Sequence, residues 1–275
     1  MSLLEGLRVT LSRMTRPTLC LLFFFTSCAA VAPAAAPMII AHRGASFEAP
    51  ENTLASYALA VEQGAQLAEC DVYLTKDGVP VLFHDADLNR TTNGTGPIVE
   101  SSLAELKQLD AGSWKGARYS EERIPTLVEF LLAVKGQLRP VIEVKGKDRN
   151  IEGAIIAALN EAKFPPEDVM MFSFHYKVLA ELARQEPSLP TTWLVTPPAA
   201  GEDLRPFFHV ALKARLSAIG VAHKHVTKEL LRRAHESGLA VYVWTVNDQA
   251  RMVELASMGV DAIITDRPAL ARASL

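Results

Sequence analysis

Short apolar runs alternate with amphipathic segments along the chain from Met38 onward. Eight runs have the nearly continuous apolar character of strands that are buried on both faces of a parallel sheet. They span 38–43, 68–73, 140–145, 169–174, 191–195, 216–221, 241–246 and 261–266. Segments with helical spacing, such as NTLASYALAVEQG and TKELLRRAHESG, lie between them. Eight strands that alternate with helices over roughly 240 residues predict a (β/α)₈ TIM barrel. A doubly wound open sheet is the alternative, and the lack of a glycine-rich phosphate loop disfavours it.

A ninth run belongs to the segment LAECDVYLTKDGVPVLFHD, residues 67–85. Asp77-Gly78 is a strong hairpin signal, and a two-residue type I′ turn there would place Asp71 opposite His84 on the facing strand. Side chains alternate along a strand, so one face would carry Glu69, Asp71 and His84. The other face would be apolar, with Ala68, Cys70, Val72, Leu74, Val81 and Phe83. We therefore expect an antiparallel hairpin arm on the second barrel strand.

The segment that follows this hairpin, residues 86–125, is polar and rich in turn-forming residues. It is too long for a plain connection between elements of a compact domain. We expect it to form either a lid or an inserted subdomain over the rim of the barrel.

Polar and ionisable residues recur where the predicted strands end, which is the edge that carries the active site in barrels of this type. Six strands contribute to this set. Polar residues at the same end of six strands are less plausible as a chance arrangement than polar residues on a single hairpin. The residues are His42, Arg43, Glu69, Asp71, Glu143, Lys145, Ser173, Phe174, His175, Trp244, Thr245, Asn247, Thr265 and Asp266.

Three of these residues, Glu69, Asp71 and Glu143, are acids that would converge at the rim. Like charges packed together repel unless a cation neutralises them, and an all-oxygen ligand set favours Mg²⁺ or Ca²⁺ over zinc. Arg43 and Lys145 add fixed positive charge beside that cation. Such a site suits an anionic substrate, and a phosphate ester is the best candidate.

Two histidines, His42 and His84, approach this rim from different strands. A pair that flanks a phosphate can serve as acid and base. Phe174 and Trp244 could form an apolar wall for the substrate. The structural alternatives are an ion pair between Glu143 and Lys145 inside the barrel, and plain core packing for Trp244.

The first 36 residues differ from the rest, because arginines precede the apolar run LCLLFFFTSCAAVAPAAA. This pattern predicts a secretory signal peptide at 1–36 and a mature domain at 37–275, and an uncleaved N-terminal anchor is the alternative. Phe25-Thr26-Ser27-Cys28 resembles a bacterial lipoprotein box, which would make Cys28 the site of a lipid anchor. We therefore expect export to the periplasm or the extracellular space, either free or membrane-anchored.

The composition is that of an ordinary globular protein: 275 residues, 49% hydrophobic and 21% charged, with a formal net charge of −3. That charge gives no indication of nucleic acid or an anionic membrane as partner, and no obligate protein partner is evident. Removal of the leader would leave Cys70 as the one cysteine, which excludes an intramolecular disulfide in the mature chain.

The motifs, taken in order, resemble those of the glycerophosphodiester phosphodiesterases. AHRGASFEAPENT is similar to their HRG…PENT signature, ECDVYLTKDGVPVLFHD to their E-x-D…H-D segment, and IEVK to their E-x-K motif. VWTVN and GVDAIITDRP are similar to the C-terminal signature. The resemblance extends from about Ile39 to Pro268, and the ordered combination is far more specific than any one motif.

The resemblance implies metal-dependent hydrolysis of glycerophosphodiesters to an alcohol and sn-glycerol 3-phosphate, in a barrel similar to that of phosphoinositide phospholipases C. Carried over residue by residue, it implies an acid–base pair of His42 and His84, and metal ligands Glu69, Asp71 and Glu143. It also implies phosphate contacts from Arg43 and Lys145. Glu51 and Asn52, from the PENT motif, are expected at the rim and join Phe174 and Trp244 as predicted substrate-binding residues.

Other functional classes stay open at this point. One is a lysophospholipase D or sphingomyelinase D that acts on intact lysophospholipids, and another is a non-catalytic barrel that binds phosphodiesters. A glycosidase could also use two carboxylates on a barrel. Arg43 and Lys145 make little sense for a neutral sugar, and the two histidines argue against a purely binding role.

Overall fold

The computed structural model describes residues 36–146, 150–199 and 201–275. The predicted leader and Cys28 lie outside the described residues. Within the described ranges, every helix is too short or too polar to cross a membrane.

Eight parallel strands form a closed barrel. They are β1 (Met38–Ala41), β2 (Leu67–Leu74), β4 (Arg139–Val144), β5 (Met170–Ser173), β6 (Thr191–Val195), β7 (Ala218–Ala222), β8 (Ala240–Trp244) and β9 (Ala262–Thr265). Strand β1 pairs in parallel with both β2 and β9, and this double pairing closes the sheet. The predicted (β/α)₈ barrel is confirmed, and the open-sheet alternative is excluded.

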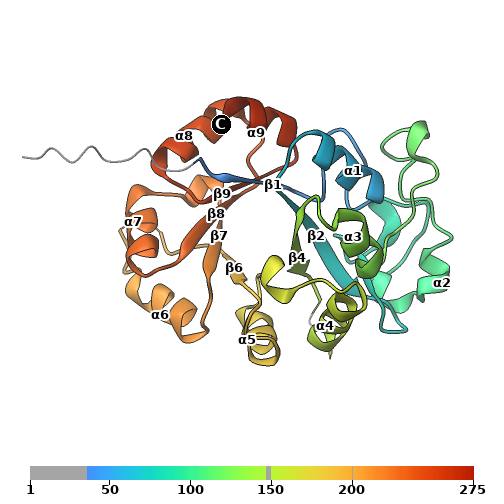
Figure 1. Cartoon of the computed structure of the whole chain (residues 1–275), viewed down its shortest axis with the longest axis horizontal. Helices are drawn as coiled ribbons and strands as arrows, with labels where there is room; N and C mark the ends of the chain where they lie inside the picture. Colours follow the sequence, from blue (N-terminus) through green and yellow to red (C-terminus); the bar gives the residue numbers. More distant parts are fainter. Residues whose placement is uncertain (1–35, 147–149, 200) are drawn as a thin grey trace, which may run out of the picture. The chain divides into compact units, whose positions relative to one another are not determined.

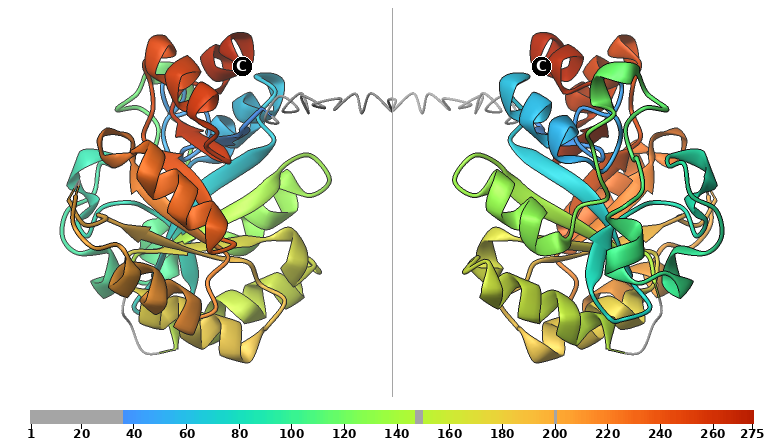
Figure 2. Two further views of the ribbon diagram at one scale, coloured as in Figure 1. Left: turned by 90° about the vertical axis from the view of Figure 1, so that its left-hand side faces the viewer. Right: turned by 90° about the vertical axis from the view of Figure 1, so that its right-hand side faces the viewer.

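Helices surround the strands, as Figures 1 and 2 show. They are α1 (Leu54–Glu62), α3 (Leu127–Val134), α4 (Ile151–Glu161), α5 (Tyr176–Gln185), α6 (Arg205–Lys213), α7 (Lys228–Glu236), α8 (Gln249–Met258) and α9 (Pro268–Ser274). Several begin where a side chain satisfies a free backbone N–H. Thr227, for example, accepts a hydrogen bond from the N–H of Leu230 at the start of α7.

Strand residues alternate between two apolar layers because their side chains point to opposite faces of the sheet. On β2, Leu67 belongs to the cluster inside the barrel, while Ala68, Cys70 and Val72 belong to the layer between strands and helices. The next residues on the inward face of β2, after Leu67, are Glu69 and Asp71. The barrel interior is therefore apolar at one end and acidic at the other.

Strand β3 (Pro80–Leu82) pairs antiparallel with β2 and forms the expected hairpin arm, but the predicted register was wrong by one residue. Thr75 N donates to Val79 O at 3.0 Å, so residues 76–78 form a three-residue loop. Gly78 alone supplies the positive φ, at 80°, whereas a type I′ turn would require it of Asp77 as well. Asp77 instead accepts hydrogen bonds from Thr75 Oγ1 and Leu103 N.

Compared with the predicted register, the observed register places two apolar side chains on the other face of the hairpin. Tyr73 pairs with Val81, and Phe83 N donates to Asp71 O at 2.9 Å, so Val81 and Phe83 share the face of Tyr73 and Asp71. His84 therefore follows the hairpin arm and does not stand directly opposite Asp71.

The 86–125 insertion contains η1 (Leu88–Arg90), η2 (Ile98–Glu100), α2 (Leu103–Leu106) and η3 (Ala117–Tyr119). Its apolar residues and the hairpin arm share a cluster of their own, which we call the satellite cluster: Val81, Phe83, Leu88, Ile98, Leu106, Ala111 and Ile124. Lys115 Nζ donates to Ser46 O at 2.8 Å, and Tyr119 Oη donates to Glu48 O at 3.1 Å. The insertion is thus a small subdomain that packs on the hairpin and on the loop after β1.

Candidate active site

The acidic end of the barrel follows from strand alternation. On β4, Val141 belongs to the cluster inside the barrel, and Glu143 is the next inward residue. The parallel register pairs Asp71 of β2 with Glu143 of β4. Both strands therefore bring their carboxylates to the same height at the carboxyl rim, which is where this fold places active sites.

Glu69, Asp71 and Glu143 form one buried cluster, in which a carboxylate oxygen of each lies within 4.8 Å of the others. Among the described residues, Glu69 Oε1 and Asp71 Oδ1 are buried oxygens that accept no hydrogen bond, and Asp71 Oδ1 has an ion-pair partner in Lys145 Nζ at 3.3 Å. Buried polar atoms are normally satisfied, so Glu69 Oε1 points to a missing partner. A hard divalent cation fits this donor set, because all its atoms are carboxylate oxygens.

Burial and the close approach of the three carboxyls shift their pKa values. Burial and the neighbouring Asp71 raise the pKa of Glu69 to about 8. Burial and Asp71 also raise the pKa of Glu143. Burial favours the neutral form of Asp71 as well, but Arg43 and Lys145 outweigh it and lower the pKa of that carboxyl. The cluster therefore holds more acid than its two cations can neutralise, which again favours a bound metal ion.

Arg43 reaches the acids because the chain turns sharply after β1. It has a positive φ of 57°, which non-glycine residues seldom adopt. The turn aims its backbone N–H at Glu69 Oε2, at 2.9 Å, and brings its Nε within 3.0 Å of Asp71 Oδ2. Lys145, on the other side, has its Nζ 2.8 Å from Glu143 Oε1 and 3.3 Å from Asp71 Oδ1. Glu143 and Lys145 thus form the ion pair that was the structural alternative for these two residues, and it lies at the rim.

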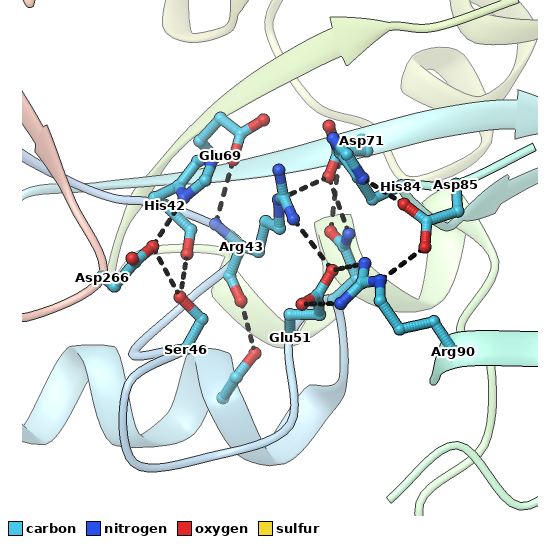
Figure 3. Close-up of polar contacts among 12 residues, drawn as sticks. His42, Arg43, Ser46, Glu51, Glu69, Asp71, His84, Asp85, Arg90 and Asp266 are labelled. Carbon is cyan, nitrogen blue, oxygen red and sulfur yellow. Dashed lines mark hydrogen bonds and ion pairs between the residues drawn. The ribbon is translucent and has the colours of Figure 1, made fainter. Parts of the chain in front are cut away.

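His42 is held by a carboxylate on one of its two ring nitrogens. Its Nδ1 lies 2.6 Å from Asp266 Oδ1 (Figure 3). Asn247 Nδ2 donates to Asp266 Oδ2 at 2.5 Å. Burial works against the charged imidazole, but the Asp266 hydrogen bond and the charge of Glu69 outweigh it and raise the pKa of His42. The contact with Asp266 leaves Nε2 as the nitrogen for proton exchange.

His84 has a matching arrangement with the opposite electrostatic result. Its Nδ1 lies 2.6 Å from Asp85 Oδ1. Burial, assisted by the positive charges of Arg43 and Lys145, lowers the pKa of His84 despite the attraction of Asp71. The two histidines therefore have pKa values displaced in opposite directions, as an acid and a base at one site require.

A pocket of about 160 Å³ joins these groups. Its lining consists of His42, Arg43, Glu69, His84, Glu143, Lys145, Phe172, Phe174, Leu194, Trp244, Thr245 and Ile264. Phe174 is 45% exposed and meets Trp244 edge to face, with ring centroids 5.6 Å apart. The pocket thus has a charged floor and an aromatic wall, and both histidines line it.

Glu51 and Asn52 do not line this pocket; they support residues that line it or lie beneath it. Asn52 has a positive φ of 58°; its Nδ2 donates to Asp71 Oδ2 at 2.8 Å, and its Oδ1 accepts from Asp71 N at 3.2 Å. Glu51 Oε1 accepts from an Arg43 guanidinium nitrogen, NH1, at 2.9 Å. Their direct contact with substrate stays a prediction.

Sequence reasoning did not assign roles to three residues that contact the site: Asp85, Arg90 and Asp266. Asp266 and Asn247 stood among the polar residues at strand ends, and that position was their available signal. Asp85 is adjacent to His84 in sequence. Nothing in the local pattern distinguishes Arg90 from other polar residues of the insertion.

The fold and the charge balance of the rim are those of a hydrolase of phosphoric diesters, and comparison with known proteins makes the class specific. The family model for the glycerophosphoryl diester phosphodiesterase family matches residues 42–270. The Bacillus subtilis protein YhdW is 38% identical over 232 residues, covering 84% of this chain and 94% of that protein. A glycerophosphodiester phosphodiesterase of Caldanaerobacter subterraneus is 36% identical over 240 residues, covering 84% of this chain and 94% of the relative.

A solved structure agrees with these matches. An Oleispira antarctica phosphodiesterase, in complex with the product sn-glycerol 3-phosphate, superposes with a TM-score of 0.80 at 34% identity. The similarity covers 87% of this chain and 96% of that one. The chain belongs to the glycerophosphoryl diester phosphodiesterase family and is a phosphoric diester hydrolase.

Proposed function

We propose that this enzyme hydrolyses glycerophosphodiesters to an alcohol and sn-glycerol 3-phosphate, with a divalent cation at the acidic cluster and acid–base catalysis by two histidines. The observation that carries this proposal is that two acids of the cluster, the two cationic side chains and both histidines line one pocket, and that the third acid, Asp71, completes the cluster. The product found in the Oleispira enzyme supports the same product here.

The metal would be held by Glu69, Asp71 and Glu143, and Ca²⁺ or Mg²⁺ suits their oxygens. When bound, it would polarise the phosphoryl oxygens and offset the charge that develops on them. Arg43 and Lys145 contribute permanent positive charge, which orients the phosphate against the histidines. Phe174 and Trp244 form the wall against which the rest of the substrate packs.

The two histidines divide the proton transfers between them. One accepts the proton of the attacking hydroxyl, and the other protonates the oxygen of the departing alcohol. The attacking group is either water or the 2-hydroxyl of the glycerol moiety, which would give a cyclic phosphate that water then opens. Attack by the 2-hydroxyl is intramolecular and gains from its fixed geometry. Unchanged turnover of a substrate deoxygenated at C2 would rule out the cyclic route.

Substrate choice follows from the size of the pocket. Its volume of about 160 Å³ is below the roughly 300–1,000 Å³ of sites that enclose drug-sized ligands. A glycerophosphoryl group is small, whereas a lysophospholipid carries a long acyl chain as well. The size of the pocket therefore suits the glycerophosphoryl group, which supports glycerophosphodiesters as the proposed substrates.

The test is a turnover screen with purified enzyme against glycerophosphocholine, glycerophosphoethanolamine, glycerophosphoglycerol and lysophosphatidylcholine. We expect release of glycerol 3-phosphate from the first three, loss of activity with EDTA, and recovery on addition of Ca²⁺ or Mg²⁺. Preferred turnover of lysophosphatidylcholine would replace the proposal with a lysophospholipase D activity. Full activity after exhaustive chelation would contradict the metal site.

Single substitutions separate the proposed roles. We expect His42→Ala and His84→Ala to lower kcat by at least about 100-fold, the usual contribution of a positioned acid or base. Calorimetric titration with Ca²⁺ or Mg²⁺ should find their metal affinity unchanged. Glu143→Ala should instead lose the metal. A His84→Ala variant with normal turnover would remove His84 from the mechanism.

We also propose that residues 1–36 direct export, with the mature form either free or anchored through a lipid on Cys28. Cell fractionation of wild-type and Cys28→Ser chains tests this proposal and separates the two forms. Membrane association that depends on Cys28 would show the anchored form. Release of both chains in soluble exported fractions would show a plain signal peptide, and retention of both chains in the cytoplasm would contradict export.

A further inference from the structure

A continuous chain of side-chain contacts connects His84 to Arg43 on the insertion side of the pocket. It runs from His84 to Asp85, from Asp85 to Arg90, from Arg90 to Glu51, and from Glu51 to Arg43 (Figure 3). Both ends of this chain line the pocket, whereas its three middle members do not. The contacts of the chain therefore connect its middle members to the pocket through His84 and Arg43.

Arg90 is the centre of this chain because its guanidinium binds two carboxylates at once. Its Nε donates to Asp85 Oδ2 at 2.5 Å. Its two terminal nitrogens donate to Glu51, NH1 to Oε2 at 2.8 Å and NH2 to Oε1 at 2.7 Å. The second contact is bidentate, a geometry that the planar guanidinium provides and an ammonium group cannot.

The backbone of Arg90 is also fixed. Arg90 ends η1, whose first residue Leu88 is 3% exposed in the satellite cluster. The insertion thus carries Arg90 to the rim on a packed support. Exposed ion pairs usually contribute little to stability, so stability alone gives a weak reason for this arrangement.

The consequence for His84 is specific. Asp85 can hold the His84 ring through Nδ1 only if its own carboxylate is fixed and ionised. Arg90 meets both conditions, since its hydrogen bond to Oδ2 leaves Oδ1 for His84 and lowers the pKa of Asp85 to about 2. Glu51, paired with Arg43 at 2.9 Å, fixes the other side of the guanidinium.

We propose that Arg90 is a positioning residue, which sets the orientation of the His84 ring by holding Asp85, while Glu51 fixes the other side of the Arg90 guanidinium. The inference rests on the acid–base role of His84 in the proposed function. It gives the 86–125 insertion a part in catalysis, through contacts behind the pocket.

The experiment compares Arg90→Ala and Arg90→Lys with the wild type on glycerophosphocholine in the presence of the activating metal. We expect kcat to fall by about 100-fold, the cost of a misplacement of about 1 Å at a reacting group. KM should change by less than about threefold, because Glu51 still pairs with Arg43 and the phosphate contacts persist. Arg90→Lys should be as impaired as Arg90→Ala, since lysine keeps the charge but cannot bridge both acids in a fork.

A matched control is available on the outer surface. Arg232 also bridges two carboxylates, those of Glu229 and Glu236 on α7, and its side chain is 49% exposed, compared with 45% for Arg90. Arg232→Lys should leave kcat and KM unchanged. Added guanidinium ion should restore part of the activity of Arg90→Ala and none of that of His84→Ala.

The outcomes separate this inference from the proposed function. An inactive wild type, or a fully active His84→Ala variant, would refute the proposed function itself. Suppose that the wild type hydrolyses glycerophosphocholine and His84→Ala is inactive. The role of Arg90 would then be overturned if both Arg90 variants kept kcat within about threefold of the wild type, or if the substitutions raised KM alone. A lower melting temperature with normal kcat would likewise show a merely structural ion pair.

Discussion

His42 owes its orientation to a carboxylate that lies 224 positions away in sequence. The Asp266 carboxylate accepts hydrogen bonds from Ser46 Oγ, at 3.0 Å, and from Asn247 Nδ2, and these two contacts hold it in position independently of the His42 ring. Burial alone would raise the pKa of Asp266, but the hydrogen bond and charge of His42, together with the hydrogen bonds from Asn247 and Ser46, lower it to about 2. An ionised and immobile acceptor at Nδ1 determines which tautomer His42 adopts when neutral.

We expect Asp266→Asn to lower kcat by at least about 100-fold, because an amide at this position can stabilise the wrong tautomer of His42. Steady-state kinetics on glycerophosphocholine measure the effect, and KM should stay close to the wild-type value. Asp261→Asn is a matched control, since Asp261 pairs with His235 at 2.9 Å on the surface. Equal kcat values for Asp266→Asn and the wild type would show that His42 does not depend on this carboxylate.

At the scale of elements, the turn between β1 and α1 is tightly constrained by its close approach to Ser56. Gly44 has a φ of +83°, and a Cβ there would lie 2.3 Å from Ser56 Oγ and 2.6 Å from Ser56 C. Ser56 Oγ donates to Arg43 O at 2.9 Å. The close approach of this turn to α1 therefore fixes the backbone from which Arg43 reaches the acids.

Gly44→Ala should lower the free energy of unfolding by about 1–3 kcal/mol more than Gly78→Ala does. Both glycines have positive φ and pay a similar conformational cost, but a Cβ at Gly78 meets nothing within 4 Å. Urea unfolding measures the difference, which isolates the overlap with Ser56. Equal losses in the two variants would mean that the turn can move away from α1.

The strands were predictable because burial on both faces leaves long apolar runs, and the rim residues were predictable because alternation continues past the apolar stretch. The run TTWLV coincides with β6, and the inward sequence Leu67, Glu69, Asp71 places acids above a core residue. The hairpin register was not predictable from the dipeptide alone. The Asp77 carboxylate accepts hydrogen bonds from Thr75 Oγ1 and from the backbone N–H of Leu103. Leu103 begins α2, a helix that the sequence pattern did not predict.

The supporting roles of Asp266 and Arg90 escaped prediction for a related reason. Both residues act through contacts between elements that are distant in sequence, such as the 39 positions between Arg90 and Glu51. A hydrophobic pattern determines which face of a strand points inward. It carries no information about which polar side chain from another loop will reach the same histidine or arginine.

At the scale of the whole molecule, the acidic cluster connects metal binding to stability. The pKa of Glu69 lies at about 8 in the metal-free fold and at 4.5 as its ordinary value. Between these two pH values the folded state retains a proton that the unfolded chain has released. The free energy of unfolding of the metal-free protein therefore carries a contribution from Glu69 that falls as pH rises through this range.

A cation that binds the native state but not the unfolded chain raises the melting temperature. At this site the cation also competes with the proton on the Glu69 carboxylate. We therefore expect the rise in melting temperature on adding Ca²⁺ or Mg²⁺ to be larger at about pH 8 than at about pH 5. Calorimetric scans at fixed ionic strength and metal concentration measure it. Glu69→Gln has no titratable carboxyl at this position, so both the metal-induced rise in melting temperature and its pH dependence should be smaller. If the wild-type rise were independent of pH, or if Glu69→Gln retained it in full, Glu69 would not be the ligand whose proton the metal displaces.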